Sequence, residues 1–269
     1  MRIGVVQLQS GEDIVDNLAL AREKVRAAAG RGARLIVLPE ATSQAFATGR
    51  LDTQAQDLDG EFATGLRATA EELGVTVVAG MFRPADTVER DGRTIHRVHN
   101  TALVTGPDIH TGYDKIHTFD AFDYAESDTV LPGREPLLFD VDGVRVGVAI
   151  CYDIRFPGLF TSLAREGAQL IVVPTSWADG PGKLAQWRLL TAARALDSTS
   201  FIAAAGQARP GGDEEAGKAS GPTGIGHSCV VDPVGRRLAE AGYAPETLIV
   251  DLDVEKVAKT RKALPVLKN

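Results

Sequence analysis

The sequence predicts an α/β protein made of two similar halves, each a β-sheet covered on its outer face by helices. Three observations predict this fold. Apolar runs of strand length alternate with amphipathic stretches of helix length along the chain. Several runs, such as 35–38, are continuously apolar, which is typical of strands buried on both faces. Two segments near the N-terminus also have close counterparts in the second half.

The counterparts indicate internal pseudosymmetry. Residues 32–39 (GARLIVLP) resemble residues 167–174 (GAQLIVVP), and residues 2–6 (RIGVV) resemble residues 145–149 (RVGVA). The spacing of these pairs is too long for a solenoid repeat. Two halves packed sheet against sheet would bury every strand. The length suits a single α/β domain over residues 1–269.

The predicted elements keep the same order of strand, helix and strand in each half. Strands are expected at 3–8, 35–38, 75–79, 100–104, 144–150, 170–173, 201–205, 229–232 and 248–251. Helices are expected at 13–29, 62–73, 156–166, 183–195 and 254–262. Asp13 is placed to cap the first helix, and Pro157 fits a first helical turn, where its missing N–H costs nothing. The segment 209–223, rich in Gly, Glu and Asp, is expected to be a solvated surface loop.

Charge and cysteine content exclude several classes of function. The formal net charge of -7 disfavours a nucleic-acid-binding protein, which would show a basic stripe. No apolar stretch is long enough to span a bilayer, and the N-terminal residues resemble a strand rather than a signal peptide. The two cysteines, Cys151 and Cys229, are too few for a disulfide framework. We therefore expect a cytoplasmic protein that binds neither nucleic acid nor membrane.

Three polar residues are candidate catalytic groups, and two of them lie at the ends of apolar runs. Cys151 follows the run 144–150 and precedes a predicted helix, whose N–H groups and dipole would lower the pKa of a thiol. Glu40 ends the run 35–39, where a carboxylate beside apolar walls can act as a base. Lys115 has aromatic and β-branched neighbours, which indicates partial burial. A structural cysteine, a capping glutamate and a surface lysine are the alternatives on position alone.

These residues lie in three motifs that resemble the signature blocks of the nitrilase superfamily, the carbon–nitrogen hydrolases. The blocks are 38–40 (LPE), 113–117 (YDKIH) and 151–157 (CYDIRFP), in the order of the family and at similar separations. Glu126 in 125–127 (AES) and the segment 226–228 (GHS) also match. The resemblance covers essentially the whole chain. It implies a four-layer α-β-β-α sandwich with internal pseudosymmetry.

The resemblance also implies a role for each matching residue. Cys151 would be the nucleophile, and Glu40 would take its proton, pass it to the leaving ammonia and then activate water. Lys115 would face the oxyanion of the tetrahedral intermediate, with the backbone N–H of Tyr152 as a second donor. Glu126 would orient Lys115 and the substrate. No metal or cofactor is implied, since a thiolate attacks an amide without one.

Further motifs resemble the branch that contains omega-amidase and deaminated-glutathione amidase. They are 180–183 (GPGK), 186–187 (QW), 193–195 (ARA) and 231–233 (VDP). This resemblance implies an amidase that cleaves a small, carboxylate-bearing amide through a cysteine thioester and releases ammonia. It also implies a homodimer or higher homo-oligomer. The stretch 180–187 (GPGKLAQW) departs from the Gly-Pro-Ala-His-Trp of the branch, and the loop before Gly226 is long.

Other activities on the same machinery remain open at this stage. A nitrilase, an N-carbamoyl hydrolase and a non-catalytic homologue that binds a ligand are the alternatives. No Gly-x-Ser-x-Gly elbow, Walker loop or dinucleotide fingerprint occurs, which argues against serine hydrolases, nucleotide hydrolases and dehydrogenases.

Four residues in or near the motifs are expected to contact substrate. They are Tyr152, Arg155, Trp177 and His227. Arg155, Lys183 and Arg209 are candidate anchors for a substrate carboxylate. Cys229 and Trp187 are expected in the core. His96 and His99 lack a third ligand at zinc-site spacing, so no metal site is expected.

Overall fold

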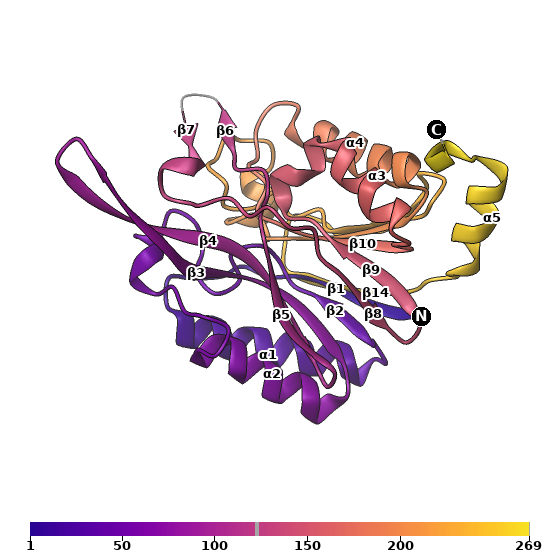
Figure 1. The fold of residues 1–269 in the computed structure, drawn as a ribbon, viewed down its shortest axis with the longest axis horizontal. Helices are drawn as coiled ribbons and strands as arrows, with labels where there is room; N and C mark the ends of the chain where they lie inside the picture. The colour runs from indigo at the N-terminus through magenta and orange to yellow at the C-terminus, as the bar shows by residue number, and fades with distance from the viewer. Residues whose placement is uncertain (122–123, 269) are drawn as a thin grey trace.

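The computed structural model describes residues 1–121 and 124–268, and its centre is a pair of six-stranded sheets (Figure 1). The first sheet contains β1 (Arg2–Gln7), β2 (Leu35–Val37), β3 (Thr76–Arg90), β4 (Arg93–Gly106), β5 (Ile109–Asp114) and β14 (Glu246–Asp251). Its strand order is β14-β1-β2-β3-β4-β5. Strands β1, β2 and β3 are parallel, and the outer strands are antiparallel.

The second sheet repeats this plan. It contains β8 (Leu138–Val141), β9 (Val144–Val148), β10 (Leu170–Thr175), β11 (Phe201–Gly206), β12 (Cys229–Val231) and β13 (Arg237–Glu240). Its order, β13-β12-β11-β10-β9-β8, also has three parallel strands at the centre and antiparallel strands outside. Strand β1 corresponds to β9, and strand β2 corresponds to β10. These are the two pairs of segments whose sequences resemble each other. The predicted pseudosymmetry is therefore confirmed.

Helices cover the outer face of each sheet (Figure 1). Helices α1 (Ile14–Gly30) and α2 (Glu61–Leu73) lie on the first sheet, and α3 (Pro157–Arg165) and α4 (Lys183–Ser198) lie on the second. Helix α5 (Glu255–Ala263) follows β14. The layers are thus α-β-β-α, as expected. The Asp13 side chain caps α1 by accepting from the N–H groups of Val15 and Asp16, and Pro157 occupies the first turn of α3.

Alternation along the central strands produces two separate apolar layers. Val5, Leu35 and Val37 belong to the cluster between the sheets, whereas Val6 and Ile36 belong to the cluster under α1 and α2. Successive strand residues point to opposite faces, so a strand with helices on one side and a sheet on the other is apolar throughout. This explains why the predicted strands are continuous apolar runs.

The structure contains strands that the apolar pattern did not predict. Strands β3 and β4 continue past the predicted segments as a long hairpin, and β5, β8 and β13 were not expected. Two short strands, β6 (Asp120–Ala121) and β7 (Tyr124–Ala125), form a separate pair. Within the described residues, no helix is long and apolar enough to cross a membrane.

Candidate active site

The predicted catalytic residues meet where the carboxyl ends of strands from both sheets converge. Glu40 follows β2, Lys115 follows β5 and Cys151 follows β9. Glu126 begins the short 3₁₀ helix η2 (Glu126–Asp128). Glu40, Lys115 and Glu126 are at most 3% exposed, and Cys151 is 8% exposed. Because ionised side chains are rarely buried without partners, this cluster is a strong candidate for a functional site.

A tight turn presents Glu40 to the cluster. Ala41 adopts a left-handed backbone conformation, with φ 57°. Gly80 on β3 lies directly against this turn, since a Cβ atom added there would lie 2.5 Å from the Ala41 nitrogen and from the Glu40 Cα. Gln207 ties the same turn to the second sheet by donating to the Glu40 carbonyl at 2.9 Å. The Glu40 side chain is therefore fixed by contacts from both sheets.

The two carboxylates share their donors. Lys115 Nζ lies 3.3 Å from Glu40 Oε1 and 2.9 Å from Glu126 Oε2. Asn100 on β4 donates its Nδ2 group to Glu40 Oε1 at 2.8 Å and to Glu126 Oε1 at 3.2 Å. Backbone N–H groups complete the set, from Ser176 to Glu40 Oε2 at 2.7 Å and from Phe119 to Glu126 Oε2 at 2.6 Å.

Lys115 is held in its charged form. Burial by itself would lower the pKa of this amine, but the negative charges of Glu126 and Glu40 outweigh burial and raise the pKa well above its ordinary value. The ammonium group therefore keeps its proton across the working pH range. It is a fixed positive charge beside the thiol, suited to stabilising an oxyanion.

The thiol of Cys151 lies at the start of a strained turn. Cys151 has φ 44°, an uncommon conformation for a residue with a side chain, and it begins the 3₁₀ helix η3 (Cys151–Arg155) that leads into α3. Such a backbone costs about 1–3 kcal/mol and persists only where its surroundings hold it. The thiol lies close enough to the Glu40 side chain and to the backbone of Ser176 for both groups to affect its pKa.

The structure corrects the expected direction of the pKa shift of Cys151. A nearby helix N-terminus was predicted to lower it, but burial and the negative charge of Glu40 raise the pKa of the thiol well above its ordinary value, with Lys115 opposing only in part. The α3 helix begins six residues after the thiol, beyond η3, so its dipole is not at the sulfur. Cys151 therefore rests as a neutral thiol beside the Glu40 carboxylate.

Three of the predicted substrate-binding residues cluster together. The guanidinium carbon of Arg155 lies 5.1 Å from the ring centre of Trp177 and 5.9 Å from that of Tyr152. Gln186 accepts from Arg155 Nη2 at 2.9 Å, which fixes the direction of the side chain. Arg155 and Tyr152 are half-buried, so a cationic group and an aromatic ring lie within four residues of Cys151 in the chain.

His227 lies apart from those three side chains. Its ring packs against Tyr243 at 4.4 Å, and its Nδ1 atom lies 2.9 Å from Glu240 Oε1. Its backbone carbonyl accepts from Trp187 Nε1 at 2.9 Å, and Trp187 in turn packs 5.4 Å from Trp177. Trp187 is fully buried, as expected. His227 is thus connected to Trp177 only indirectly, through the hydrogen bond between its carbonyl and Trp187.

Arg209 is already bound within the protein, which overturns its prediction as a substrate anchor. It is 6% exposed and its Nε atom lies 3.3 Å from Asp179 Oδ2. A buried guanidinium needs such a partner. Asp179 also accepts from the Gly217 N–H at 2.8 Å, and Ser176 Oγ donates to the Pro222 carbonyl at 2.6 Å. The loop 209–223 is largely exposed as expected, but these contacts fasten it to the segment after β10.

The histidines that suggested a metal have other partners. His99 Nδ1 lies 2.9 Å from the Leu131 carbonyl, and His96 Nδ1 lies 3.1 Å from Thr87 Oγ1. Across residues 1–121 and 124–268, no group of three or more His, Cys, Asp or Glu side chains could hold a metal ion.

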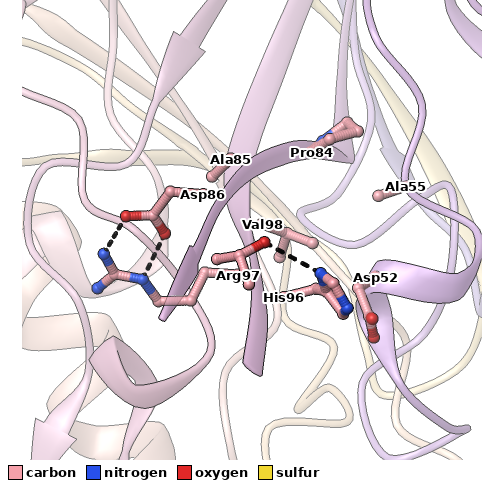
Figure 2. A pocket seen from close by; sticks show the side chains of 9 residues that line it. Asp52, Ala55, Pro84, Ala85, Asp86, His96, Arg97 and Val98 are labelled. Atoms are coloured by element: carbon pink, nitrogen blue, oxygen red, sulfur yellow. Dashed lines mark hydrogen bonds and ion pairs between the residues drawn. The ribbon is translucent and has the colours of Figure 1, made fainter. Parts of the chain in front are cut away.

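A pocket of about 350 Å³ lies at the base of the β3–β4 hairpin (Figure 2). Its Arg97 side chain is paired with Asp86, and its His96 ring with Thr87. None of its lining residues belongs to the Cys151 cluster. Since its charged groups are largely satisfied by one another, we assign it no chemistry.

Sequence reasoning missed residues that act on the cluster from outside the motifs. Asn100 stands at the start of a predicted strand, and a polar residue opening an apolar run was the available signal. Ser176 lies one position after Thr175, the counterpart of Glu40 in the other half of the chain, so pseudosymmetry could have drawn attention to this turn. Asp153 lies inside a quoted motif but was given no role.

Comparison with known proteins identifies the family of this arrangement. The sequence profile of the family described as Carbon-nitrogen hydrolase matches residues 2–262. The chain belongs to the carbon–nitrogen hydrolase family. The resemblance seen in the three motifs is therefore confirmed, as is the expectation of an enzyme of the amidase class.

Two curated relatives match this carbon–nitrogen hydrolase over its whole length. A protein named as a hydrolase from Mycobacterium tuberculosis is 49% identical, over 100% of this chain and 95% of its own. An omega-amidase from Danio rerio is 35% identical, over 99% of this chain and 93% of its own. The likeness to omega-amidases is therefore not confined to the short motifs, since it extends over nearly the whole chain.

Solved structures confirm the fold. Nit3 of Saccharomyces cerevisiae, from branch 10 of the nitrilase superfamily, superposes with a TM-score of 0.81 at 27% identity, over 99% of this chain and 94% of that one. A variant of the Nesterenkonia amidase has a TM-score of 0.77 at 25% identity, with 98% of both chains covered. In that structure acrylamide is attached by Michael addition to the active-site cysteine. That similar protein thus has a cysteine in its active site.

Proposed function

We propose that this carbon–nitrogen hydrolase cleaves the amide of a small, carboxylate-bearing substrate through a thioester on Cys151 and releases ammonia. One observation supports the proposal above all. A buried thiol lies beside a carboxylate, Glu40, whose charge acts on the thiol pKa and which itself contacts a charged ammonium group, Lys115. This combination supplies a nucleophile, a base and a fixed positive charge within one cluster.

In the proposed reaction, proton movements accompany each bond change. Glu40 takes the thiol proton as the sulfur attacks the carbonyl carbon, and Lys115 and the Tyr152 N–H stabilise the oxyanion. Glu40 passes the proton to the departing nitrogen, which leaves as ammonia. It then takes a proton from water, which attacks the thioester and frees the acid and the thiol. Glu126 keeps Lys115 oriented throughout, which its contact at 2.9 Å supports.

Arg155 is the proposed anchor for the substrate carboxylate. Its guanidinium lies between the Trp177 and Tyr152 rings, and a planar guanidinium suits bidentate contact with a carboxylate. His227 is proposed to support this surface through Trp187. The similarity to omega-amidases favours the same class of substrate.

A substrate panel tests the proposal against the alternatives. The panel contains a monoamide of a short dicarboxylic acid, a neutral amide of equal length, the matching nitrile and an N-carbamoyl amino acid. We expect ammonia release to be fastest with the monoamide. In the Arg155→Met variant, loss of a charged hydrogen bond should lower kcat/KM for the monoamide about 10- to 100-fold, mainly through KM.

The Arg26→Met variant, which removes a surface arginine of α1, is the matched control and should behave as wild type. Preferential turnover of the nitrile or of the carbamoyl compound would establish one of those activities instead. Turnover of no member of the panel, together with tight binding of the monoamide, would establish a ligand-binding homologue.

We also infer that the enzyme works in the cytoplasm as a homodimer. The two free cysteines, both buried, fit a reducing compartment. On α4, Leu189 is 69% exposed and Leu196 is 45% exposed. These residues are seven apart, so they lie on one outer face of the helix, suited to pairing across helices.

The dimer is tested by sedimentation velocity. We expect a species of twice the chain mass of 28.5 kDa, and a shift toward monomer when Leu189 and Leu196 are both replaced by glutamate. A wild-type protein that sediments only as monomer at micromolar concentration would refute it.

A further inference from the structure

Asp153, two residues after the nucleophile, is a fully buried carboxylate that accepts four hydrogen bonds. Its Oδ2 atom accepts from the Ile150 N–H at 2.9 Å and from the Tyr113 hydroxyl at 2.8 Å. Its Oδ1 atom accepts from the His117 N–H at 3.0 Å and from His117 Nδ1 at 2.7 Å. Asp153 is 0% exposed, so these donors replace all of its contact with water.

The four donors come from the two segments that carry the reactive groups. Ile150 immediately precedes Cys151. Tyr113 and His117 stand two residues before and two residues after Lys115. One carboxylate therefore connects the turn of the nucleophile to both flanks of the lysine, although these segments are far apart in the sequence.

The donors of this connection are themselves fixed. Tyr113 is 1% exposed, and burial together with the charge of Asp153 raises the pKa of its hydroxyl well above the ordinary value, so the group remains a donor. The His117 ring stacks on Phe156 with centres 3.7 Å apart and planes 8° apart. The Ile150 bond closes the turn in which Cys151 has φ 44°.

We propose that Asp153 is a positioning residue that clamps the Lys115 strand end to the Cys151 turn and so sets the distance between oxyanion stabiliser and nucleophile. This inference rests on the proposed function of those two residues. Asp153 contacts neither the thiol nor the ammonium, and it acts through Ile150, Tyr113 and His117. Its effect should fall on the chemical step, since displacement of reacting groups by about 1 Å can cost about 10²-fold in rate.

The test is the Asp153→Asn variant, assayed with the amide that the wild-type enzyme turns over fastest. Asparagine has the same shape as aspartate, but its NH₂ group replaces one of the two accepting oxygens. The donors that face this NH₂ group lose their acceptor, so some of the four hydrogen bonds must break. We expect kcat to fall about 10²-fold while KM changes less than about threefold. A role in stability alone would instead leave kcat of the folded protein unchanged.

Asp232 offers a matched control. It is also 0% exposed and accepts from the N–H groups of Val234 and Arg236 and from Lys256. It follows β12 at the end of the sheet opposite to Cys151, because Val231 pairs with Ile202 near the start of β11. Asp232→Asn should lower thermal stability to a comparable extent and leave kcat unchanged.

Tyr113→Phe provides a second, milder test that removes one bond and keeps the ring. We expect a smaller loss of kcat in the wild-type background and no further loss when Asp153→Asn is already present, because the two act as one unit. If Asp153→Asn does not fold, Tyr113→Phe alone decides.

Three outcomes would each overturn the clamp. One is a kcat in Asp153→Asn equal to that of Asp232→Asn, and another is an effect of Asp153→Asn confined to KM. The third is a Tyr113→Phe enzyme with full kcat. These outcomes leave the assignment of Cys151 intact, whereas undiminished turnover after replacing Cys151 would remove the proposed function itself.

Discussion

Replacing Cys151 with alanine is expected to abolish ammonia release from every amide that the enzyme accepts. The sulfur is the only atom of the proposed cluster that forms a bond to substrate, and the hydroxyl of the nearby Ser176 donates to the Pro222 carbonyl. Losing the nucleophile of a hydrolase costs on the order of 10⁴- to 10⁶-fold in kcat. The measurement is ammonia production under saturating amide, with circular dichroism to show that the fold persists.

The second cysteine supplies the control for this experiment. Cys229 on β12 is fully buried in the core between helix α4 and the second sheet. Cys229→Ala removes one buried sulfur and should retain kcat within about twofold, at a small cost in stability. Equal activity of the Cys151→Ala and wild-type enzymes would eliminate the thiol mechanism.

Replacing Glu40 with glutamine is expected to have the second-largest effect. Glutamine keeps the shape of the side chain but can accept from only one of Asn100 and Ser176, and it cannot take a proton from the thiol. General-base catalysis contributes about 10²–10⁴-fold, and Glu40 is proposed to act in both half-reactions. We therefore expect kcat to fall by at least about 10³-fold, measured by ammonia release.

The same variant should make direct alkylation of Cys151 occur at lower pH. Burial and then the charge of Glu40 raise the pKa of the thiol, so removing that charge leaves burial alone and Lys115 still favouring the thiolate. The midpoint of the iodoacetamide rate against pH should thus shift downward as amidase activity is lost.

A glutamate on the surface controls for the change in net charge. Glu72 of α2 pairs with Arg26 and its side chain is 60% exposed. Glu72→Gln should alter neither activity nor alkylation. An upward shift of the alkylation midpoint in Glu40→Gln, or an activity within tenfold of wild type, would contradict the assignment of Glu40 as base.

The apolar pattern predicted the central strands and the helices because each of them faces a core. Helix α1 was expected at 13–29 and lies at Ile14–Gly30, and α3 was expected at 156–166 and lies at Pro157–Arg165. The sequence similarity of the two halves predicted equivalent strands, and the sheet orders bear this out. These features follow from burial, which the spacing of apolar residues in a single sequence indicates.

The hairpins were missed because their strands are partly solvated, yet their turns had a recognisable signal. Asp91–Gly92 joins β3 to β4 with φ values of 50° and 71°, and Asp142–Gly143 joins β8 to β9 with φ values of 50° and 77°. Positive φ at both central positions is the conformation that Asp-Gly favours in two-residue hairpins. Giving those dipeptides more weight would have predicted both hairpins.

The site was predicted in its reactive groups but not in its supporting contacts. Glu40 and Cys151 follow apolar runs, Lys115 has aromatic and β-branched neighbours, and all three lie inside motifs, so they can be found one at a time. Asn100 and Ser176 matter only because folding brings them to Glu40. The pKa of Cys151 was predicted in the wrong direction for the same reason, since the local helix was visible in the sequence but the burial of the thiol and the charge of the distant Glu40 were not.

The most direct test of the central claim is to trap the acyl-enzyme. The enzyme is mixed with a slowly hydrolysed amide, quenched with acid within one turnover and digested for mass spectrometry. The account predicts the acyl mass on the peptide that contains Cys151 and an unmodified Cys229 peptide. Full ammonia release with no acyl group on Cys151 at any quench time would contradict it.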